Sequence, residues 1–240
     1  MMMWHKGALS ALVLGIALAL SGCGTKGEGE GSMLGLASQQ VLGSIKAKRT
    51  STNTGPPLVV EITPQQLANT KVAALQVNLE KRGGSDFLRR IAQRTDDHPG
   101  TVSVWRASDG ADLILRGGVV VGSRGIGADI ISSDATQTVR AIAGARAGQG
   151  ERRYFISNGD YTDTQVSLSC DIDNLGRDDT IVVQQRFHTV HLRETCIGGA
   201  DDAVRIVNDY WVQPGSGLVR RSRQWTGPLS GYFEIILLKT

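Results

Sequence analysis

The sequence has few cysteines, few histidines and little excess positive charge, and each of these shortages excludes a class of protein. Three cysteines and four histidines among 240 residues exclude a cysteine-rich zinc framework and a large disulfide scaffold. The formal net charge of +3 is too small to indicate nucleic acid as a partner, because that interaction needs a concentrated basic surface. The chain also has no Gly-x-Ser-x-Gly nucleophile elbow and no Gly-x-x-x-x-Gly-Lys phosphate loop, and no motif indicates a cofactor.

The chain does contain enough apolar sequence for a packed core. Hydrophobic residues make up 40% and charged residues 20% of the chain, as in a folded protein of one or two domains. Glycine occupies 30 positions, above the usual share of about 7%, and this favours strands and turns over long helices.

The first residues have the pattern of a bacterial lipoprotein signal peptide. The apolar run Gly7–Leu20, of about 14 residues, is shorter than the roughly 20 residues needed to cross a bilayer. It ends in Leu20-Ser21-Gly22-Cys23, which resembles a lipobox: the two small side chains expose the backbone to a peptidase, and the Cys23 thiol accepts diacylglycerol. We therefore predict a signal peptide over 1–22 and lipidation of Cys23. Glycine at position 24, by analogy with known lipoproteins, favours the outer membrane over the inner one.

Lipidation of Cys23 leaves Cys170 and Cys196 in the oxidising periplasm. We predict a disulfide between them, which would close a loop of roughly 27 residues and contribute about 3–4 kcal/mol in the chain-entropy model. Two free buried thiols are the alternative.

Composition divides the mature chain into a tether and a folded region. Residues 23–57 combine a glycine-rich tether, a short amphipathic helix over 33–45 and a linker. That helix either lies on the membrane or a partner, or packs on its own domain. Residues 58–240 form a β-rich periplasmic domain, with a division into β subdomains 58–148 and 149–240 left open.

Short strand-like segments at a spacing of about 8–14 residues predict a mainly β fold, an antiparallel sandwich or open-barrel sheets with one or two short helices. Helical turns are expected at Pro64–Leu67 and Ser133–Ile142. We also expect one strand over Thr180–His188, a break at Gly148–Gly150 and a turn at Asn174–Gly176. The glycine-rich stretch over 122–127 is interpreted as a conformationally demanding turn, not a nucleotide loop.

The titratable residues do not form a catalytic or metal-binding set. His188 and His191 would point to opposite faces of a strand, because side chains alternate with a period of two. The acidic pairs lie beside turns without a histidine or a third carboxylate, and they are Asp171 with Asp173 and Asp201 with Asp202. We therefore predict no metal site, no catalytic residues and no enzymatic activity.

Aromatic and arginine residues gather near the C-terminus. Aromatic faces beside polar donors suit the stacking of sugar rings, but large aromatics in a small β domain also form cores, and both interpretations stay open. The candidate contact residues for polysaccharide or a partner protein are Tyr210, Trp211, Arg223, Trp225 and Tyr232.

Two stretches, together with the lipobox, resemble the YjbF/GfcB family of capsule and exopolysaccharide lipoproteins. The first stretch is Leu115–Ile130, and the more specific one runs from Asn208-Asp-Tyr-Trp through Arg223-Gln-Trp to Gly231-Tyr232. The resemblance covers about residues 35–240. It implies a mostly β outer-membrane lipoprotein and carries no catalytic residues with it. The Cys170/Cys196 pair is not a general feature of that family, so the disulfide prediction rests on the compartment.

The function expected from this resemblance is support of capsule or exopolysaccharide export or assembly, by binding or docking and not by catalysis. Expected partners are the outer membrane through the lipid anchor, the polysaccharide, and an outer-membrane barrel or other export proteins. A periplasmic polysaccharide hydrolase or lyase, and a structural lipoprotein that docks an outer-membrane β-barrel, are the alternatives.

Overall fold

Most of the folded chain lies in the strands of one large antiparallel sheet. The computed structural model describes residues 61–158 and 162–240, so the predicted signal peptide, Cys23, the helix over 33–45 and the linker lie outside the described residues. The sheet strands are β1 Ala74–Leu79, β2 Ser85–Arg94, β3 Val102–Arg106, β4 Asp112–Arg116, β5 Val119–Arg124, β6 Ile130–Asp134, β7 Gly148–Ser157, β8 Asp163–Arg177, β11 Val190–Gly198, β12 Val204–Gln213, β13 Leu218–Trp225 and β14 Tyr232–Lys239.

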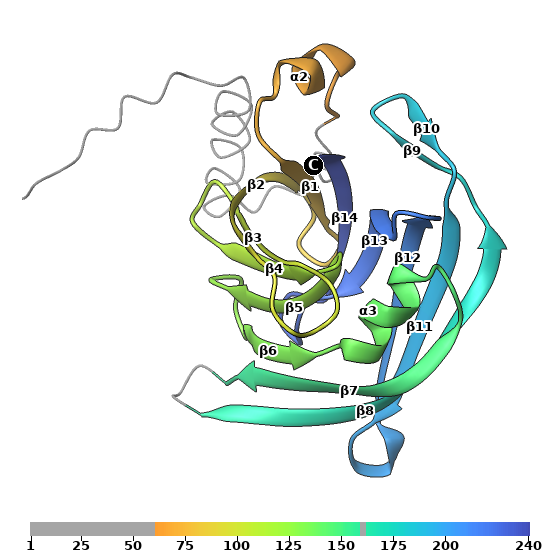
Figure 1. Ribbon diagram of the computed structural model, residues 1–240. Helices are drawn as coiled ribbons and strands as arrows, with labels where there is room; N and C mark the ends of the chain where they lie inside the picture. The colour runs from red at the N-terminus through yellow and green to blue at the C-terminus, as the bar shows by residue number, and fades with distance from the viewer. Residues whose placement is uncertain (1–60, 159–161) are drawn as a thin grey trace, which may run out of the picture. The chain divides into compact units, whose positions relative to one another are not determined.

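These 12 strands follow the order β5-β4-β3-β2-β1-β14-β13-β12-β11-β8-β7-β6 and curl into a nearly closed barrel (Figure 1). The fold class predicted from sequence is confirmed, and of its two forms the open barrel is the one observed. Strands from residues 58–148 and from 149–240 share the sheet, because the first strand, β1, pairs with the last, β14.

Alternating polarity sets the two faces of each strand. In β8 the buried side chains of Leu168, Cys170 and Ile172 alternate with exposed polar ones, which places the apolar set inside the barrel. The inner faces of the strands pack into a core that includes Leu75, Leu168 and Ile235.

Side chains, not a strand ladder, close the barrel at the free edge of β5. The Val120 N–H donates to Gln224 Oε1 at 2.8 Å, and the amide of Gln224 donates back to the Gly118 carbonyl at 2.8 Å. Arg152 Nη2 donates to the Val120 carbonyl at 2.7 Å. Gly118 has a φ of +88°, and a Cβ there would lie 2.5 Å from Val219 Cγ2, so only glycine lets β5 approach β13 this closely. These side chains thereby supply hydrogen-bond partners to backbone N–H and C=O groups of β5 and its turn that no neighbouring strand pairs.

Helix α3, Thr136–Ala143, lies inside the curl of the sheet (Figure 1). Its buried Val139 and Ile142 pack with Leu192, Tyr210 and Val212 of the long strands. The helix predicted over Ser133–Ile142 is therefore largely correct, although Ser133 and Asp134 end β6 instead. The Asp134 carboxylate accepts the backbone N–H of Thr136 at 3.1 Å, and backbone and side-chain hydrogen bonds from Thr136 lower the pKa of Asp134.

The short helix α2, Pro64–Asn69, is also where the sequence predicts a helical turn. Thr63 caps it, and its side chain accepts the Gln66 N–H while the Gln66 side chain accepts the Thr63 N–H.

The single strand expected over Thr180–His188 is wrong. The segment forms a hairpin of β9, Thr180–Val182, and β10, Gln185–Phe187. Val183 and Gln184 turn the chain with φ values of +46° and +67°, which are turn conformations that neither residue type signals in the sequence. The buried Val182 of the hairpin packs with Leu67 of α2 and Leu238 of β14 in a small cluster separate from the main core.

The expected break at Gly148–Gly150 and the turn at Asn174–Gly176 are also wrong, because both segments continue strands β7 and β8. The glycines of β7 have a packing reason. A Cβ at Gly150 would lie 2.5 Å from Gln137 Cγ of α3, so small residues let the helix lie on this strand. The turn expected over 122–127 is only partly confirmed: residues 122–124 end β5, and the chain turns from Gly125, where the Asp129 carboxylate accepts the N–H groups of Gly125 and Ile126.

Candidate functional site

The predicted contact residues lie on two different sides of the barrel wall. In the ladder between β12 and β13, Tyr210 faces Ser222 and points inward, whereas Asp209 faces Arg223 and points outward. Trp211 is two residues from Asp209 and shares its outer face. Tyr210 therefore belongs to the interior, and Trp211, Arg223 and their neighbours form the surface that can meet a ligand.

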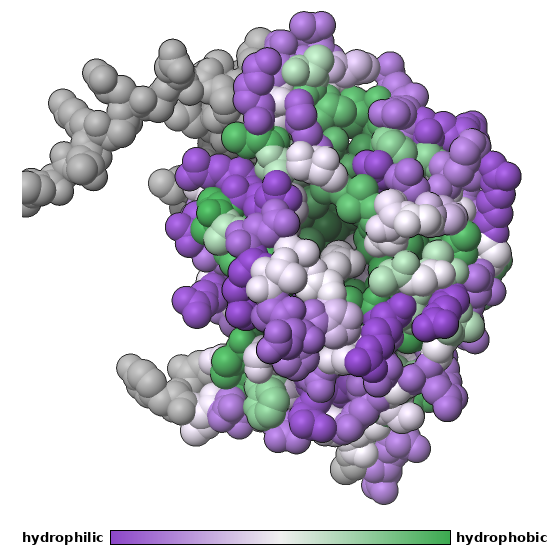
Figure 2. Space-filling view, in the orientation of Figure 1, coloured by the Kyte–Doolittle hydropathy of each residue, from purple (hydrophilic) through white to green (hydrophobic). Residues whose placement is uncertain are grey.

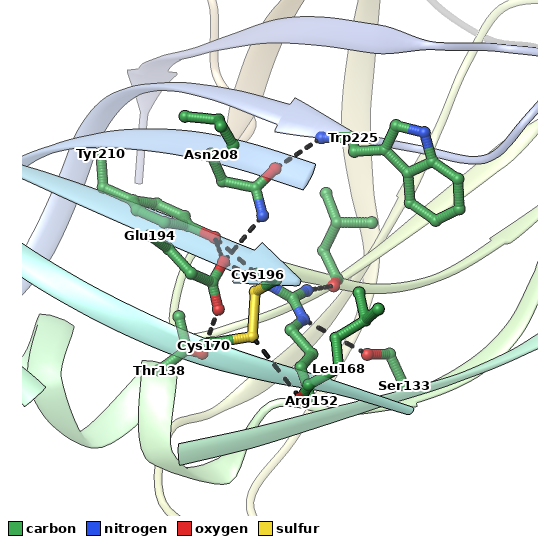
Figure 3. The surroundings of a disulfide bond; sticks show 12 residues. Ser133, Thr138, Arg152, Leu168, Cys170, Glu194, Cys196, Asn208, Tyr210 and Trp225 are labelled. Atoms are coloured by element: carbon green, nitrogen blue, oxygen red, sulfur yellow. Dashed lines mark hydrogen bonds and ion pairs between the residues drawn. A yellow bond between two sulfur atoms is a disulfide. The ribbon is translucent and has the colours of Figure 1, made fainter. Parts of the chain in front are cut away.

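The interior holds a fully buried ion pair (Figure 3). Glu194 of β11 and Arg152 of β7 are 0% and 1% exposed in their side chains, and Glu194 Oε2 accepts from Arg152 Nη1 at 2.7 Å. The same oxygen accepts from the Tyr210 hydroxyl at 3.0 Å and from the Asn208 amide at 2.7 Å. Its second oxygen accepts from Thr138 of α3. Four elements of the fold, β7, β11, β12 and α3, are thus joined at one carboxylate, which is the kind of complete pairing that a buried charge requires.

The surroundings of Arg152 keep its guanidinium charged. Burial by itself lowers the pKa of Arg152, but the negative charge of Glu194 and the nearby tyrosines outweigh burial, so its pKa is raised. Burial, and then the charge of Glu194, raise the pKa of Tyr210 well above its usual value. The tyrosine therefore stays a neutral hydrogen-bond donor at every physiological pH.

The predicted disulfide between Cys170 and Cys196 is confirmed. The two residues face each other across β8 and β11, with a sequence separation of 26 (Figure 3). Both are buried, and the Glu194 carboxylate lies within 4.8 Å of the sulfurs. The bond joins β8 to β11, the strand that carries Glu194, and both sulfurs are engaged in it.

Trp225 packs against the core, which is one of the two roles that the sequence left open for the aromatic residues. Its ring meets Tyr154 edge to face, with centroids 5.2 Å apart, and packs against the main core. Its backbone N–H donates to Asn208 Oδ1 at 2.8 Å. Trp225 is therefore a partly buried residue that packs against the main core.

Trp211 is held in a ladder of side chains on the outer face. His191 of β11 and Arg221 of β13 are its cross-strand neighbours. The imidazole stacks on the indole with centroids 4.5 Å apart and an interplanar angle of 9°, and the guanidinium lies 4.9 Å from the indole centroid. The indole N–H donates to Asp178 at 2.7 Å. Trp211 therefore supplies a fixed, half-buried wall.

Beside Trp211 lies an outer-face groove of about 300 Å³, lined by Asn78, Leu79, Glu80, Gly83, Gly84, Trp211, Arg221, Arg223 and Glu234. Arg223 makes a two-fold contact with Glu80, at 2.7 Å for each hydrogen bond, and its guanidinium lies 3.8 Å from the centroid of the Tyr232 ring. The Tyr232 hydroxyl accepts the Val207 N–H at 3.0 Å, which fixes the ring beneath the arginine.

A second ion pair continues the outer-face groove. Glu234 accepts from Arg221 and, at 2.6 Å, from the Asn78 amide. The arginines and carboxylates that line the groove thus occur as pairs and leave it without net charge. Half-exposed guanidinium, carboxylate and amide groups beside an indole edge are suited to hydroxyl-rich ligands.

Sequence reasoning missed half of this groove. Asn78 and Glu80 come from β1 and its turn, far along the chain from Arg223, and only the pairing of β1 with β14 brings them together. It also missed Glu194 and Arg152, whose charge suggests a solvent position until the strand register is known.

The other candidate groups do not converge. His188 bonds to Asp179, while His191 bonds to Asp209 at 2.7 Å on a different element. The four carboxylates considered as acids or bases, Asp171, Asp173, Asp201 and Asp202, are exposed. No helix within the described residues is long and apolar enough to cross a membrane.

These features define a mainly β, barrel-like domain with a groove on its outer face, and comparison with known proteins gives its family. The chain belongs to the YjbF family, described as group 4 capsule polysaccharide lipoprotein GfcB, YjbF, whose model matches residues 55–238. It is therefore a capsule-related lipoprotein, of a family anchored to a membrane of the cell envelope.

Among solved structures, the fold is similar to the hypothetical lipoprotein YmcC from Escherichia coli (K12), with 17% sequence identity and a TM-score of 0.63. The similarity covers 88% of this chain and 98% of that chain. Among curated proteins, no match is found.

Proposed function

We propose that this protein is an outer-membrane lipoprotein that supports capsule or exopolysaccharide export or assembly by binding the polymer in its outer-face groove, without catalysing a change of bonds. The observation that carries the proposal is the groove itself, where Trp211, Arg223 and Glu80 meet at the surface. Family membership supplies the capsule context.

The charge balance of the groove indicates what it recognises. Arg223 is paired with Glu80, and Arg221 with Glu234, so there is no surplus charge to attract a polyanion. Vicinal hydroxyls of a sugar can bridge such a pair, accepting from the guanidinium and donating to the carboxylate. Binding through hydroxyls predicts an affinity that changes little between low and high salt, because screening acts mainly on net charge.

Anchoring at Cys23 would keep the domain at the membrane on which export takes place. Replacing Cys23 with serine removes the thiol that accepts lipid, so the variant is expected to accumulate as a larger, unprocessed precursor. Fractionation of membranes that carry wild type or Cys23→Ser measures this. Equal processing and equal retention in the outer membrane would contradict the assignment.

The groove is tested with a double variant, Glu80→Gln with Arg223→Gln, which removes the pair and keeps its volume. The matched control is Glu151→Gln with Arg153→Gln, because this pair is also half-exposed and lies on β7, outside the groove. Affinity electrophoresis of the full chain through gels that contain the host's polymer measures binding. We expect at least tenfold weaker binding for the groove variant and unchanged binding for the control.

The same variants, expressed in a deletion strain, show whether binding supports export. We expect less surface polymer with the groove variant, at unchanged membrane level and melting temperature. Equal surface polymer with both double variants would contradict the proposal. Shortening of purified polymer by the protein, or loss of output after Asp171→Asn or Asp201→Asn in a stable protein, would replace it with an enzymatic function.

A further inference from the structure

A second cavity opens on the inner side of the sheet, at the mouth of the barrel. It has a volume of about 350 Å³, more than twice the roughly 150 Å³ that lets an apolar cavity hold benzene. Figure 2 looks into it: a hollow near the middle of this face has hydrophobic residues at its floor. The cavity does not depend on the outer-face groove, because its walls are the inward side chains of the strands.

The walls of this barrel-mouth cavity are mostly apolar. Leu75, Leu115 and Ile235 line it from β1, β4 and β14, and each is at most 5% exposed. Val139 and Ala143 of α3 form the opposite wall. Interior cavities of β-barrels with this lining are the usual place for a single small apolar ligand.

Two polar groups mark one side of the cavity. Trp105 of β3 lines it and is 4% exposed, yet its indole N–H has no hydrogen-bond acceptor among the described residues. Arg90 of β2 also lines it, and its guanidinium lies 5.7 Å from the centroid of the same indole. None of the ion pairs among the described residues involves Arg90.

A buried donor without an acceptor is rare, since leaving it unpaired costs about 1–3 kcal/mol. A ligand oxygen would satisfy it. A half-buried guanidinium next to that donor, without a carboxylate of its own, favours an acidic group at the same place. Apolar walls with a guanidinium and a free N–H donor at one end suit an amphiphile whose head is anionic.

We propose that the barrel-mouth cavity binds one long-chain acyl ligand with an acidic head, placing its acyl chain against Leu115 and Ile235 and its head at Arg90 and Trp105. The acidic head separates this ligand from the lipid that we predict on Cys23, since acyl groups linked to that cysteine carry no negative charge. The occupant is therefore a free amphiphile, such as a fatty acid, and not the chain's own anchor.

The test uses the full lipidated chain in nanodiscs and a long-chain fatty acid that carries a photoactivatable diazirine. After irradiation, peptide mass spectrometry locates the labelled residues. We expect labelling at Leu115, Val139 and Ile235, and competition by excess palmitate. Ile131 and Leu175 serve as internal controls, because they are apolar but 57% and 51% exposed. Labelling spread equally over these two residues would overturn the proposal.

Three variants sharpen the result. Ala143→Trp, on the exposed surface of α3 at the mouth, should block entry and reduce cavity labelling at least tenfold while the protein stays folded. Arg90→Gln should reduce it several-fold, whereas Arg89→Gln, its exposed neighbour on the other face of β2, should not. Trp105→Phe keeps the ring and removes the N–H, and should also weaken labelling.

The probe's methyl ester, which lacks the acidic head, should label the cavity as weakly as the acid labels Arg90→Gln. Equal labelling by acid and ester, or unchanged labelling in Ala143→Trp, would overturn the proposal. Labelling that appears in Cys23→Ser but not in the lipidated protein would assign the cavity to the chain's own lipid, and would overturn it as well.

Discussion

The inner and outer faces of strands β12 and β13 carry the same kinds of residue and use them differently. Asn208 and Gln224 point inward and bond to buried backbone or to Glu194, whereas Asp209 and Arg223 point outward and form ion pairs at the surface. Strand alternation separates the two sets within one short motif. The stretch Asn208–Tyr232 that resembles the family therefore contributes to two features: its inward residues help to close the barrel, and its outward residues line the outer-face groove.

The two faces also differ in what their polar groups contribute to stability. Removing one partner of a buried pair leaves an uncompensated charge and costs about 3–5 kcal/mol, whereas exposed pairs are worth about 0–1 kcal/mol. The inner face should therefore govern folding, and the outer face should govern binding. Four predictions test this division.

The largest effect is expected for Arg152→Met. It removes the buried guanidinium that pairs with Glu194, so the free energy of unfolding should fall by about 3–5 kcal/mol. Denaturant unfolding measures it. Arg153→Met is the control, because the next residue along β7 points outward and its side chain is 41% exposed, and it should change stability by about 0.5 kcal/mol or less. Similar losses of unfolding free energy in the two variants would contradict the claim that the inner face contributes more to stability than the outer face.

A somewhat smaller loss is expected when the disulfide is removed. Replacing Cys170 and Cys196 together with alanine frees a loop that spans 26 positions, and the free energy of unfolding should fall by about 2–4 kcal/mol. Melting the oxidised wild type, the reduced wild type and the variant gives the value. Equal stability of the three samples would show that the disulfide does not contribute to the free energy of unfolding.

Gln224→Leu should cost about 2 kcal/mol, because it leaves the Val120 N–H and the Gly118 carbonyl without partners inside the barrel. Gln165→Leu on β8 is the control, since Gln165 is exposed. Hydrogen exchange at Val120 provides a local readout and should become faster only in the Gln224 variant. Unchanged exchange there would argue against side-chain closure of the β5 edge.

The smallest effect on stability is expected for Arg221→Gln with Arg223→Gln. Both arginines are partly exposed, with side chains 43% and 36% accessible, so the free energy of unfolding should fall by about 1 kcal/mol or less. The affinity for polymer should nevertheless drop at least tenfold. A large loss of stability with retained binding would reverse the roles assigned to the two faces.

The sequence predicted most strands, the short helix at Pro64 and the disulfide, because each depends on local signals or on cysteine parity in an oxidising compartment. It erred where glycine and polar residues have packing roles. Gly148–Gly150 reads as a break, but these residues lie in β7, and Gly150 makes room for Gln137 of α3. Val183-Gln184 reads as strand, but it turns a hairpin.

The sequence by itself determined the lipoprotein signature, the mainly β class and the family motif that ends in Arg223-Gln224-Trp225. The tertiary structure alone decided which aromatic residues line the outer-face groove: Trp225 packed against the core, Tyr210 joined a buried carboxylate, and Trp211 stayed outside. It also brought Glu80 to Arg223 across 143 residues. The physical reason is that side-chain alternation is local, while the register and closure that give each face its neighbours arise from pairing between distant strands.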